Sequence, residues 1–229
     1  MKEQIDTLKR AAGEKAVEYI EDGMIIGLGS GSTVFWTLKK LGLLVEQGLN
    51  VKGIPSSKRT EGWAREFHIP LTDFSKVEML DVAIDGADEI DPNLNLIKGG
   101  GGSLVREKIV DVHSKKLIIV ADESKMVSQL GKFPLPVEIL SFGWELTAEK
   151  IAAIGGNPRL RMDEGKPFIS NNGNYIVDCD FKKIANPEEL HHQLKQMLGV
   201  VETGLFIGIA DTIIIASKTD VKVIDKKLS

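Results

Sequence analysis

The stretch that decides the fold reads Asp85-Gly-Ala-Asp88-Glu-Ile-Asp-Pro-Asn-Leu-Asn-Leu-Ile-Lys98-Gly-Gly-Gly-Gly102-Ser-Leu-Val-Arg106-Glu107-Lys108. The apolar run Val82-Ala-Ile84 precedes it and predicts a buried strand. Two carboxylates leave the end of this strand, and a lysine, four consecutive glycines and a helical pattern follow. Glycines let the backbone approach a ligand closely, and N–H groups at the start of a helix can bind an anion or an oxyanion. Carboxylates, an ammonium group and bare amides at one strand end predict a catalytic site.

Short apolar strands alternate with helical patterns on both sides of this stretch. We expect helices at 2–20, 34–47, 58–67 and 103–114, and strands at 24–26, 50–54, 69–71, 80–85, 116–122, 210–216 and 221–224. Such alternation is typical of α/β proteins, in which helices cover both faces of a parallel sheet. The sequence therefore predicts a Rossmann-like, mainly parallel sheet with helices on both faces.

The pattern changes after Gly131. We expect strands at 134–140, 159–162, 174–181 and 200–206, and helices at 144–154 and 187–198. The order βαββαβ is that of a compact, ferredoxin-like α+β unit. We therefore expect residues 1–132 and 206–229 to form a catalytic Rossmann-like α/β domain, with residues 133–205 inserted as a small α+β domain that is a candidate oligomer interface.

Composition narrows the partners of the chain. The 229 residues carry a net charge of −4, which argues against general binding to a nucleic acid backbone. No apolar run approaches the roughly 20 residues of a membrane span, and the N-terminus has no apolar leader segment. The single cysteine, Cys179, cannot form an intrachain disulfide, which fits a reducing compartment. We expect a cytoplasmic protein with no nucleic acid or membrane partner.

A glycine-rich turn, Gly27-Leu-Gly-Ser30-Gly31-Ser32-Thr33, stands where a phosphate-binding loop would stand. A dinucleotide fingerprint would need glycine in place of Ser32 and an acidic residue after the second strand, and a P-loop would need a Gly-Lys pair. Three hydroxyls and a helix N-terminus remain, and they suit one phosphate or sugar hydroxyls. The alternative is a tight turn with a helix cap.

Other polar segments have simpler interpretations. Ser56-Ser-Lys-Arg-Thr-Glu61 resembles an ordinary helix cap with solvated charges, and we favour that interpretation. Lys125, after the strongest strand, either reaches the same edge of the sheet or is solvated. The four histidines lack metal-ligand spacing with one another or with the cysteine, so we expect no metal site.

Glu107 has two interpretations. Leu104, Val105, Ile109 and Val112 form the expected buried stripe of its helix, and Glu107 points away from that stripe. Taken alone, it is a surface glutamate; taken with the glycines and acids before it, it is a general base on a rigid helix. Asp85 and Asp88 likewise suit a turn and a cap, and the nearby lysine and glycines favour a catalytic role.

The motifs together closely resemble the type A ribose-5-phosphate isomerase family. The resemblance rests on the glycine-rich turn, on Asp85-Gly-Ala-Asp88 and Lys98-Gly-Gly-Gly101 with Arg106-Glu107-Lys108, and on Ala121-Asp-Glu-Ser-Lys125 and Leu130-Gly-Lys-Phe-Pro-Leu-Pro-Val137. It covers nearly the whole chain. One departure is Ser30, where the family pattern has threonine; the hydroxyl is kept.

The resemblance implies interconversion of ribose 5-phosphate and ribulose 5-phosphate, a step of the non-oxidative pentose phosphate pathway, without a metal or an organic cofactor. It implies that Glu107 accepts and returns the proton, and that the protein is a dimer or a tetramer. The substrate-binding residues that it implies are Ser30, Gly31, Ser32, Thr33, Asp85, Gly86, Ala87, Asp88, Lys98, Gly99, Gly100, Gly101 and Lys125.

Physical chemistry agrees with these roles. Isomerisation passes through an enediolate, which one positioned carboxylate can form and resolve. Lys98 and the glycine amides can stabilise its negative oxygen, while Asp85 can handle a hydroxyl proton during ring opening. Asp88 can orient a sugar hydroxyl or the lysine. For the phosphate we favour the loop hydroxyls with Lys125. We expect these groups to converge around one sugar.

Two other functions compete with this one. Phosphosugar-sensing domains of some bacterial transcription regulators resemble the fold, but those proteins carry an N-terminal DNA-binding domain, and only one helix precedes the first strand here. A nicotinamide-dependent oxidoreductase is disfavoured by the broken fingerprint. A coupled isomerase assay, a DNA shift assay and a cofactor titration distinguish the three functions.

Overall fold

The computed structural model describes residues 2–227, which form two compact units. The first unit runs to Ala87 and adds Arg106–Lys125 and the chain from Ile209 onward, and the second consists of Asp88–Val105 and Met126–Gly208. The expected small domain, 133–205, falls inside the second unit, which also includes the glycine-rich stretch. Met1 and residues 228–229 of the expected catalytic domain lie outside the described residues.

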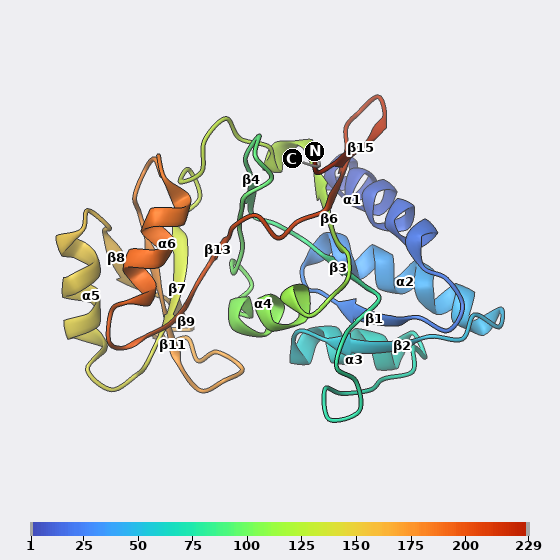
Figure 1. Ribbon diagram of the computed structural model, residues 1–229, viewed down its shortest axis with the longest axis horizontal. Coiled ribbons are helices and arrows are strands. Elements are labelled where there is room, and N and C mark those ends of the chain that lie inside the picture. Colours follow the sequence, from blue (N-terminus) through green and yellow to red (C-terminus); the bar gives the residue numbers. More distant parts are fainter. Residues whose placement is uncertain (1, 228–229) are drawn as a thin grey trace. The chain divides into compact units, whose positions relative to one another are not determined.

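A six-stranded sheet organises the first unit (Figure 1). Its order is β15-β14-β6-β3-β1-β2, and all neighbours are parallel except β14 and β15. The expected parallel α/β sheet is confirmed. The strands are β1 (Ile25–Leu28), β2 (Lys52–Pro55), β3 (Val82–Asp85), β6 (Leu117–Asp122), β14 (Thr212–Ala216) and β15 (Val221–Asp225).

One expected strand of this unit, at 69–71, is wrong. The segment makes only an isolated bridge between Gly53 and Leu71. Pro70 accepts a hydrogen bond from Gly53 through its carbonyl, but it has no N–H with which to continue a ladder.

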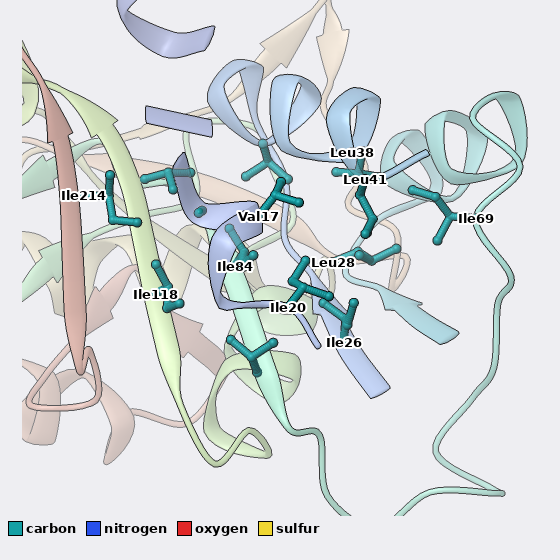
Figure 2. Packing of buried hydrophobic residues seen from close by; sticks show 14 of the residues in the cluster. Val17, Ile20, Ile26, Leu28, Leu38, Leu41, Ile69, Ile84, Ile118 and Ile214 are labelled. Carbon is teal, nitrogen blue, oxygen red and sulfur yellow. The ribbon is translucent and has the colours of Figure 1, made fainter. Parts of the chain in front are cut away.

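Helices cover both faces of the sheet in the first unit. Alternate strand residues, such as Ile26, Leu28 and Ile84, pack with Leu38 and Leu41 of α2 (Figure 2). On the opposite face, a Cβ at Gly27 would lie 2.6 Å from Cγ1 of Val110, so α4 packs directly on the strand backbone there. The helices are α1 (Lys2–Ala16), η1 (Val17–Tyr19), α2 (Ser32–Glu46), α3 (Lys58–Glu66), α4 (Leu104–Val112) and η2 (Glu123–Lys125).

The strand order creates a topological switch point. β1 lies between β2 and β3, so the chain leaves β1 toward one side of the sheet and later returns to its other side. In open α/β sheets, ligands bind outside the carboxyl ends of the strands at such a point. Here the Gly29 N–H donates to the Ile84 carbonyl at 3.0 Å, which places the segments after β1 and β3 side by side.

The second unit contains the expected βαββαβ pattern. Its four-stranded antiparallel sheet has the order β12-β7-β11-β8. Ile151 of α5 and Leu194 of α6 are fully buried in the same apolar cluster as Val137 and Val177 of the sheet. The elements are β7 (Leu135–Ile139), α5 (Trp144–Ala153), β8 (Pro158–Leu160), β11 (Tyr175–Cys179), α6 (Pro187–Lys195) and β12 (Val200–Thr203).

Two small sheets of the second unit were not expected from the sequence, although β13 (Leu205–Phe206) and the first residue of β9 (Met162–Asp163) lie within the expected strands 200–206 and 159–162. A three-stranded sheet joins β4 (Glu89–Ile90), β5 (Leu96–Ile97) and β13, and a hairpin joins β9 to β10 (Lys166–Pro167). Two-residue strands are too short to show an alternating pattern. The first of these sheets matters for the site, because it holds the backbone from which Lys98 extends.

Within residues 2–227, none of the helices combines the length and apolar character that crossing a membrane demands.

Candidate active site

Asp85 occupies the carboxyl end of β3 in the first unit and is fully buried. One of its carboxylate oxygens, Oδ1, accepts hydrogen bonds from the N–H groups of Ser30 (2.9 Å) and Gly86 (2.6 Å). A Cβ on Gly29 would overlap the Asp85 carboxyl group, so this position needs glycine. The carboxylate is thus fixed by backbone groups on both sides of the switch point.

Glu107 lies in the first turn of α4 and is 4% exposed. The Ser30 hydroxyl donates to its Oε1, while the N–H of the same serine donates to Asp85. One residue of the glycine-rich turn therefore binds both carboxylates. The first unit brings Asp85, Ser30 and Glu107 together, although they are far apart in the sequence.

The expected buried stripe of α4 is wrong at Ile109 and Val112, although Leu104 is fully buried. Ile109 and Val112 are 45% and 48% exposed, whereas Glu107 and Asp111 are buried with Leu104 and Val110. The stripe was assigned from apolar residues alone, but the buried face of this helix carries two acids at a spacing of four residues. A buried acid on a rigid helix is a stronger indication of function than the expected surface position.

The N-terminus of α2 forms the rest of the turn. Gly31 is the N-cap residue, with a φ of 101°, and no side chain caps the helix. Its first turn contains no acidic residue, so the positive end of the helix dipole is not neutralised from within the helix. Ser32 is exposed and Thr33 is buried. These features suit an anion.

The segment 56–61 caps α3, as expected, and also contacts the glycine-rich turn. The Ser57 hydroxyl accepts the Thr60 N–H at 3.0 Å, which confirms the expected helix cap. The Thr60 hydroxyl also donates to the Gly29 carbonyl at 2.8 Å and so supports the glycine-rich turn. Sequence reasoning missed this contact, because a helix threonine that holds a distant loop has the same sequence pattern as one that does not.

Lys125 ends η2, the short helix that follows β6. It is half-buried, and Asp122 fixes the preceding turn by accepting the Ser124 N–H at 3.0 Å. Because β6 is parallel to β3, its carboxyl end lies at the same edge of the sheet as Asp85. Of the two positions expected for Lys125, the structure has the residue at this edge, where it is half-buried.

The second unit holds the ammonium group and the glycines. Lys98 is 2% exposed, its N–H donates to Gly204 at 2.9 Å, and its Nζ lies 5.2 Å from the centre of the Phe206 ring. A cation over an aromatic face is stabilised by the ring quadrupole. Phe206 was missed by sequence reasoning, since it belongs to a two-residue strand more than a hundred positions away.

Asp88 acts on the glycine loop of the same unit. Its Oδ2 accepts the Gly100 N–H at 2.8 Å, and its own N–H donates to the Ile97 carbonyl at 2.8 Å. The Gly102 N–H donates to Gly99 at 3.0 Å and closes a turn. The N–H groups of Gly100 and Gly102 therefore already have hydrogen-bond partners. A ligand would bind the N–H groups of the other two glycines of the loop.

Neither metal nor thiol chemistry has a candidate site in the described part of the chain. Residues 2–227 contain no group of three or more His, Cys, Asp or Glu side chains placed to hold a metal ion. Cys179 is fully buried, and burial raises the pKa of its thiol far above the ordinary value. It is a packing residue of the β11 strand.

Comparison with known proteins identifies the family. A family model described as ribose 5-phosphate isomerase A (phosphoriboisomerase A) matches residues 52–220, which is more than half of the chain. The chain belongs to this family. A curated relative, ribose-5-phosphate isomerase A of Bacillus mycoides (strain KBAB4), is 54% identical over 94% of this chain and 98% of its own length.

Solved structures of the ribose-5-phosphate isomerase A family have the same fold. Ribose 5-phosphate isomerase from Plasmodium falciparum superposes with a TM-score of 0.94 at 42% identity, over 97% of this chain and 100% of its own. A D-ribose-5-phosphate isomerase in complex with phospho-erythronic acid gives a TM-score of 0.94 at 38% identity, over 96% and 99% of the two chains. The expected family and fold class are confirmed.

Proposed function

We propose that this chain interconverts D-ribose 5-phosphate and D-ribulose 5-phosphate through an enediolate, with Glu107 as the general base. Membership of the ribose-5-phosphate isomerase A family supports the reaction. The observation that carries the choice of base is the burial of Glu107 on α4 with a hydroxyl donor, Ser30, that is itself bonded to Asp85.

Glu107 takes the proton from C2 of the open-chain aldose and returns it to C1. A hydroxyl proton passes from the oxygen on C2 to the oxygen on C1, so the reaction gains and loses no atom. A carboxylate placed by a helix contributes about 10²- to 10⁴-fold to such a transfer. During ring opening, Asp85, held by two N–H groups, takes the proton of the C1 hydroxyl and passes it to the ring oxygen as the bond between C1 and that oxygen breaks.

Lys98 stabilises the developing oxyanion together with amides of the glycine loop. Because the N–H groups of Gly100 and Gly102 already have partners, we assign this role to Gly99 and Gly101. Asp88 keeps the loop in shape through Gly100. A buried ammonium group is worth more to an oxyanion than an exposed one, because the surrounding dielectric is low.

We assign the phosphate to Gly31, Ser32 and Thr33 at the N-terminus of α2, with Lys125 as the counter-charge. The helix dipole and the absence of an acid in the first turn favour an anion there. Gly86 and Ala87 line the strand end beside Ser30, and a Cβ on Gly86 would approach the Ser30 carbonyl to 3.3 Å. A related structure contains phospho-erythronic acid, and we expect the same acid to inhibit this chain.

The deciding experiment supplies ribose 5-phosphate to the purified protein and follows ketose formation. We expect turnover, and in D₂O we expect NMR to detect deuterium at the carbon that receives the proton. A protein that is folded and yet forms no ketose would refute the proposal.

We also propose that the enzyme is a homo-oligomer and that the second unit forms the contact. Large apolar side chains are exposed there, with Phe142 at 95% and Leu198 at 85%, beside Leu140 and Leu146. The Leu140 N–H donates to Gly199 at 2.9 Å, which brings the two loops together. Apolar surface of this kind marks contact sites. Sedimentation velocity should show an oligomer that the double variant Phe142→Ser, Leu198→Ser dissociates.

We further propose a cytoplasmic location. The chain has a single cysteine, which suits a reducing compartment. Cell fractionation followed by the isomerase assay tests this location.

A further inference from the structure

The glycine loop of the second unit is contacted by an arginine far from it in the sequence. Arg161 lies between β8 and β9, and its Nη1 donates to the carbonyls of Gly99 (2.9 Å) and Gly100 (3.3 Å). The Gly100 carbonyl belongs to the same peptide group as the Gly101 N–H, which is one of the two amides assigned to the oxyanion. A donor that holds a carbonyl also holds the N–H of the following residue in orientation, because the two groups lie in one planar peptide unit.

Arg161 is itself fixed at every part of its side chain. Its Nε donates to Oδ2 of Asp178 at 2.9 Å, and its Nη2 donates to Oδ1 of the same residue. This two-pronged pair uses the planar geometry that only arginine offers. The arginine side chain is 13% exposed, and its guanidinium lies 5.8 Å from the centre of the Phe168 ring.

The backbone around Arg161 is equally constrained. Its N–H donates to Ile176 of β11 at 2.8 Å, and its carbonyl accepts the Phe168 N–H at 2.8 Å. Phe168 in turn packs on the far end of the glycine loop, since a Cβ on Gly102 would overlap its ring. The small α+β sheet therefore contacts the loop at both ends, through a guanidinium at Gly99 and Gly100 and through an aromatic ring at Gly102.

We propose that Arg161, with Asp178 and Phe168, is a positioning residue that orients the glycine loop toward the developing oxyanion. The inference rests on the proposed isomerase function, because it assigns a purpose to the loop. Arg161 touches the loop carbonyls and no reacting atom in this scheme. Loss of the Arg161 side chain should destabilise the transition state more than it weakens substrate binding, because the proposed phosphate site is at α2 in the first unit.

The kinetic test compares Arg161→Ala and Arg161→Lys with Arg159→Ala, which removes an exposed arginine of β8 and serves as the matched control. Loop displacements of about 1 Å cost up to roughly 10²-fold, so we expect kcat to fall about 10- to 100-fold in Arg161→Ala. KM should change by less than about threefold, because uniform binding is kept. Lysine cannot bind Asp178 and both carbonyls together, so Arg161→Lys should recover only part of the loss.

Two further readouts separate positioning from a merely structural effect. Millimolar guanidinium should restore turnover to Arg161→Ala and not to a Glu107→Gln variant. Phospho-erythronic acid, whose carboxylate can occupy the oxyanion position, should lose affinity in parallel with kcat, while inorganic phosphate should bind as in the unchanged protein. An Arg161→Ala variant with normal kcat, or with a loss that guanidinium does not reverse, would overturn the inference.

Amide hydrogen exchange tests the loop without any use of activity. Exchange at Gly100 and Gly102 should accelerate by about tenfold or more in Arg161→Ala and remain unchanged in Arg159→Ala. Faster exchange in a chain that forms no ketose would keep the role of Arg161 in the loop and refute the isomerase function. Unchanged exchange in an active enzyme would keep the function and refute the role of Arg161.

Discussion

The two units hold the charged groups of the proposed reaction by different means. In the first unit, Asp85 and Glu107 are carboxylates at the carboxyl edge of a parallel sheet, and Ser30 from the adjacent strand end binds both. In the second unit, the cation Lys98 and the glycine loop are held by residues from distant antiparallel segments, such as Phe206 and Arg161. In the proposed reaction, residues of the first unit move protons and residues of the second unit stabilise negative charge.

The contrast predicts different consequences of substitution in the two units. In the first unit, Asp85 is positioned by backbone N–H groups, which most side-chain substitutions leave in place, and Glu107 accepts the Ser30 hydroxyl. The loop of the second unit is positioned by side chains, so single substitutions there alter its geometry.

Glu107→Gln should retain the fold and substrate affinity but lose about 10²- to 10⁴-fold in kcat, because an amide cannot accept the proton. Steady-state kinetics measure kcat and substrate affinity, and thermal unfolding measures whether the fold is retained. Glu66→Gln, at an exposed position of α3, is the control and should be unchanged. Near-normal turnover by Glu107→Gln would remove the first unit from proton transfer.

Lys98→Met removes the buried ammonium group of the second unit while keeping most of the side-chain volume. We expect kcat to fall about 10²- to 10³-fold, as when an oxyanion donor is lost. The free energy of unfolding should change by less than about 1.5 kcal/mol, because the swap conserves volume. Lys132→Met, at an exposed position of the same unit, controls for loss of a lysine. Normal turnover by Lys98→Met would show that the second unit does not stabilise the oxyanion through Lys98.

Neighbouring glycines of the loop should respond in opposite ways. Gly102 has a φ of 81° and its Cβ would meet the Phe168 ring, whereas a Cβ on Gly101 would meet nothing within 4 Å. Gly102→Ala should therefore lower the free energy of unfolding by about 1–3 kcal/mol, and Gly101→Ala should change it little. Urea unfolding of the two variants measures the difference. Equal stabilities would mean that the aromatic contact does not constrain the loop.

Asp81, at the amino end of β3, provides the smallest test. It accepts the Ile25 N–H and pairs with Lys115, each at 2.8 Å. The Ile25 N–H first, and then Lys115, hold the pKa of its carboxyl group below the ordinary value. A lowered folded-state pKa stabilises the protein above the unfolded-state pKa, and this contribution disappears as the pH falls through the folded-state value.

Asp81→Asn should therefore be less stable by about 0.5–1.5 kcal/mol at pH 7. The deficit should shrink when the pH is lowered below about 4, near the ordinary pKa of an aspartate. Kinetic constants should not change, in contrast to substitution of Asp85 at the other end of the same strand. Chemical unfolding at both pH values provides the measurement, with exposed Asp163→Asn as control. If the loss of stability in Asp81→Asn is the same at both pH values, its cause is not the charge of the Asp81 carboxylate.

The sequence predicted the first unit better than the second, and the reason is locality. Strand ends, glycines and acids stand next to one another in the chain, so the site residues around Asp85 could be found from their spacing. The expected buried face of α4 was wrong, because apolar periodicity cannot recognise a buried acid such as Glu107. The contacts of Phe206 and Arg161 depend on two-residue strands and on a hairpin, which leave no periodic signal.

The chain passes between the two units four times, at 87/88, 105/106, 125/126 and 208/209. Neither unit is therefore a continuous piece of polypeptide that could be cut out, exchanged or expressed alone by a single truncation. A nonsense mutation or a proteolytic nick anywhere before the last passage leaves the parallel sheet without β14 and β15 in the same polypeptide. Engineering of this scaffold should consequently proceed by point substitution within the intact chain.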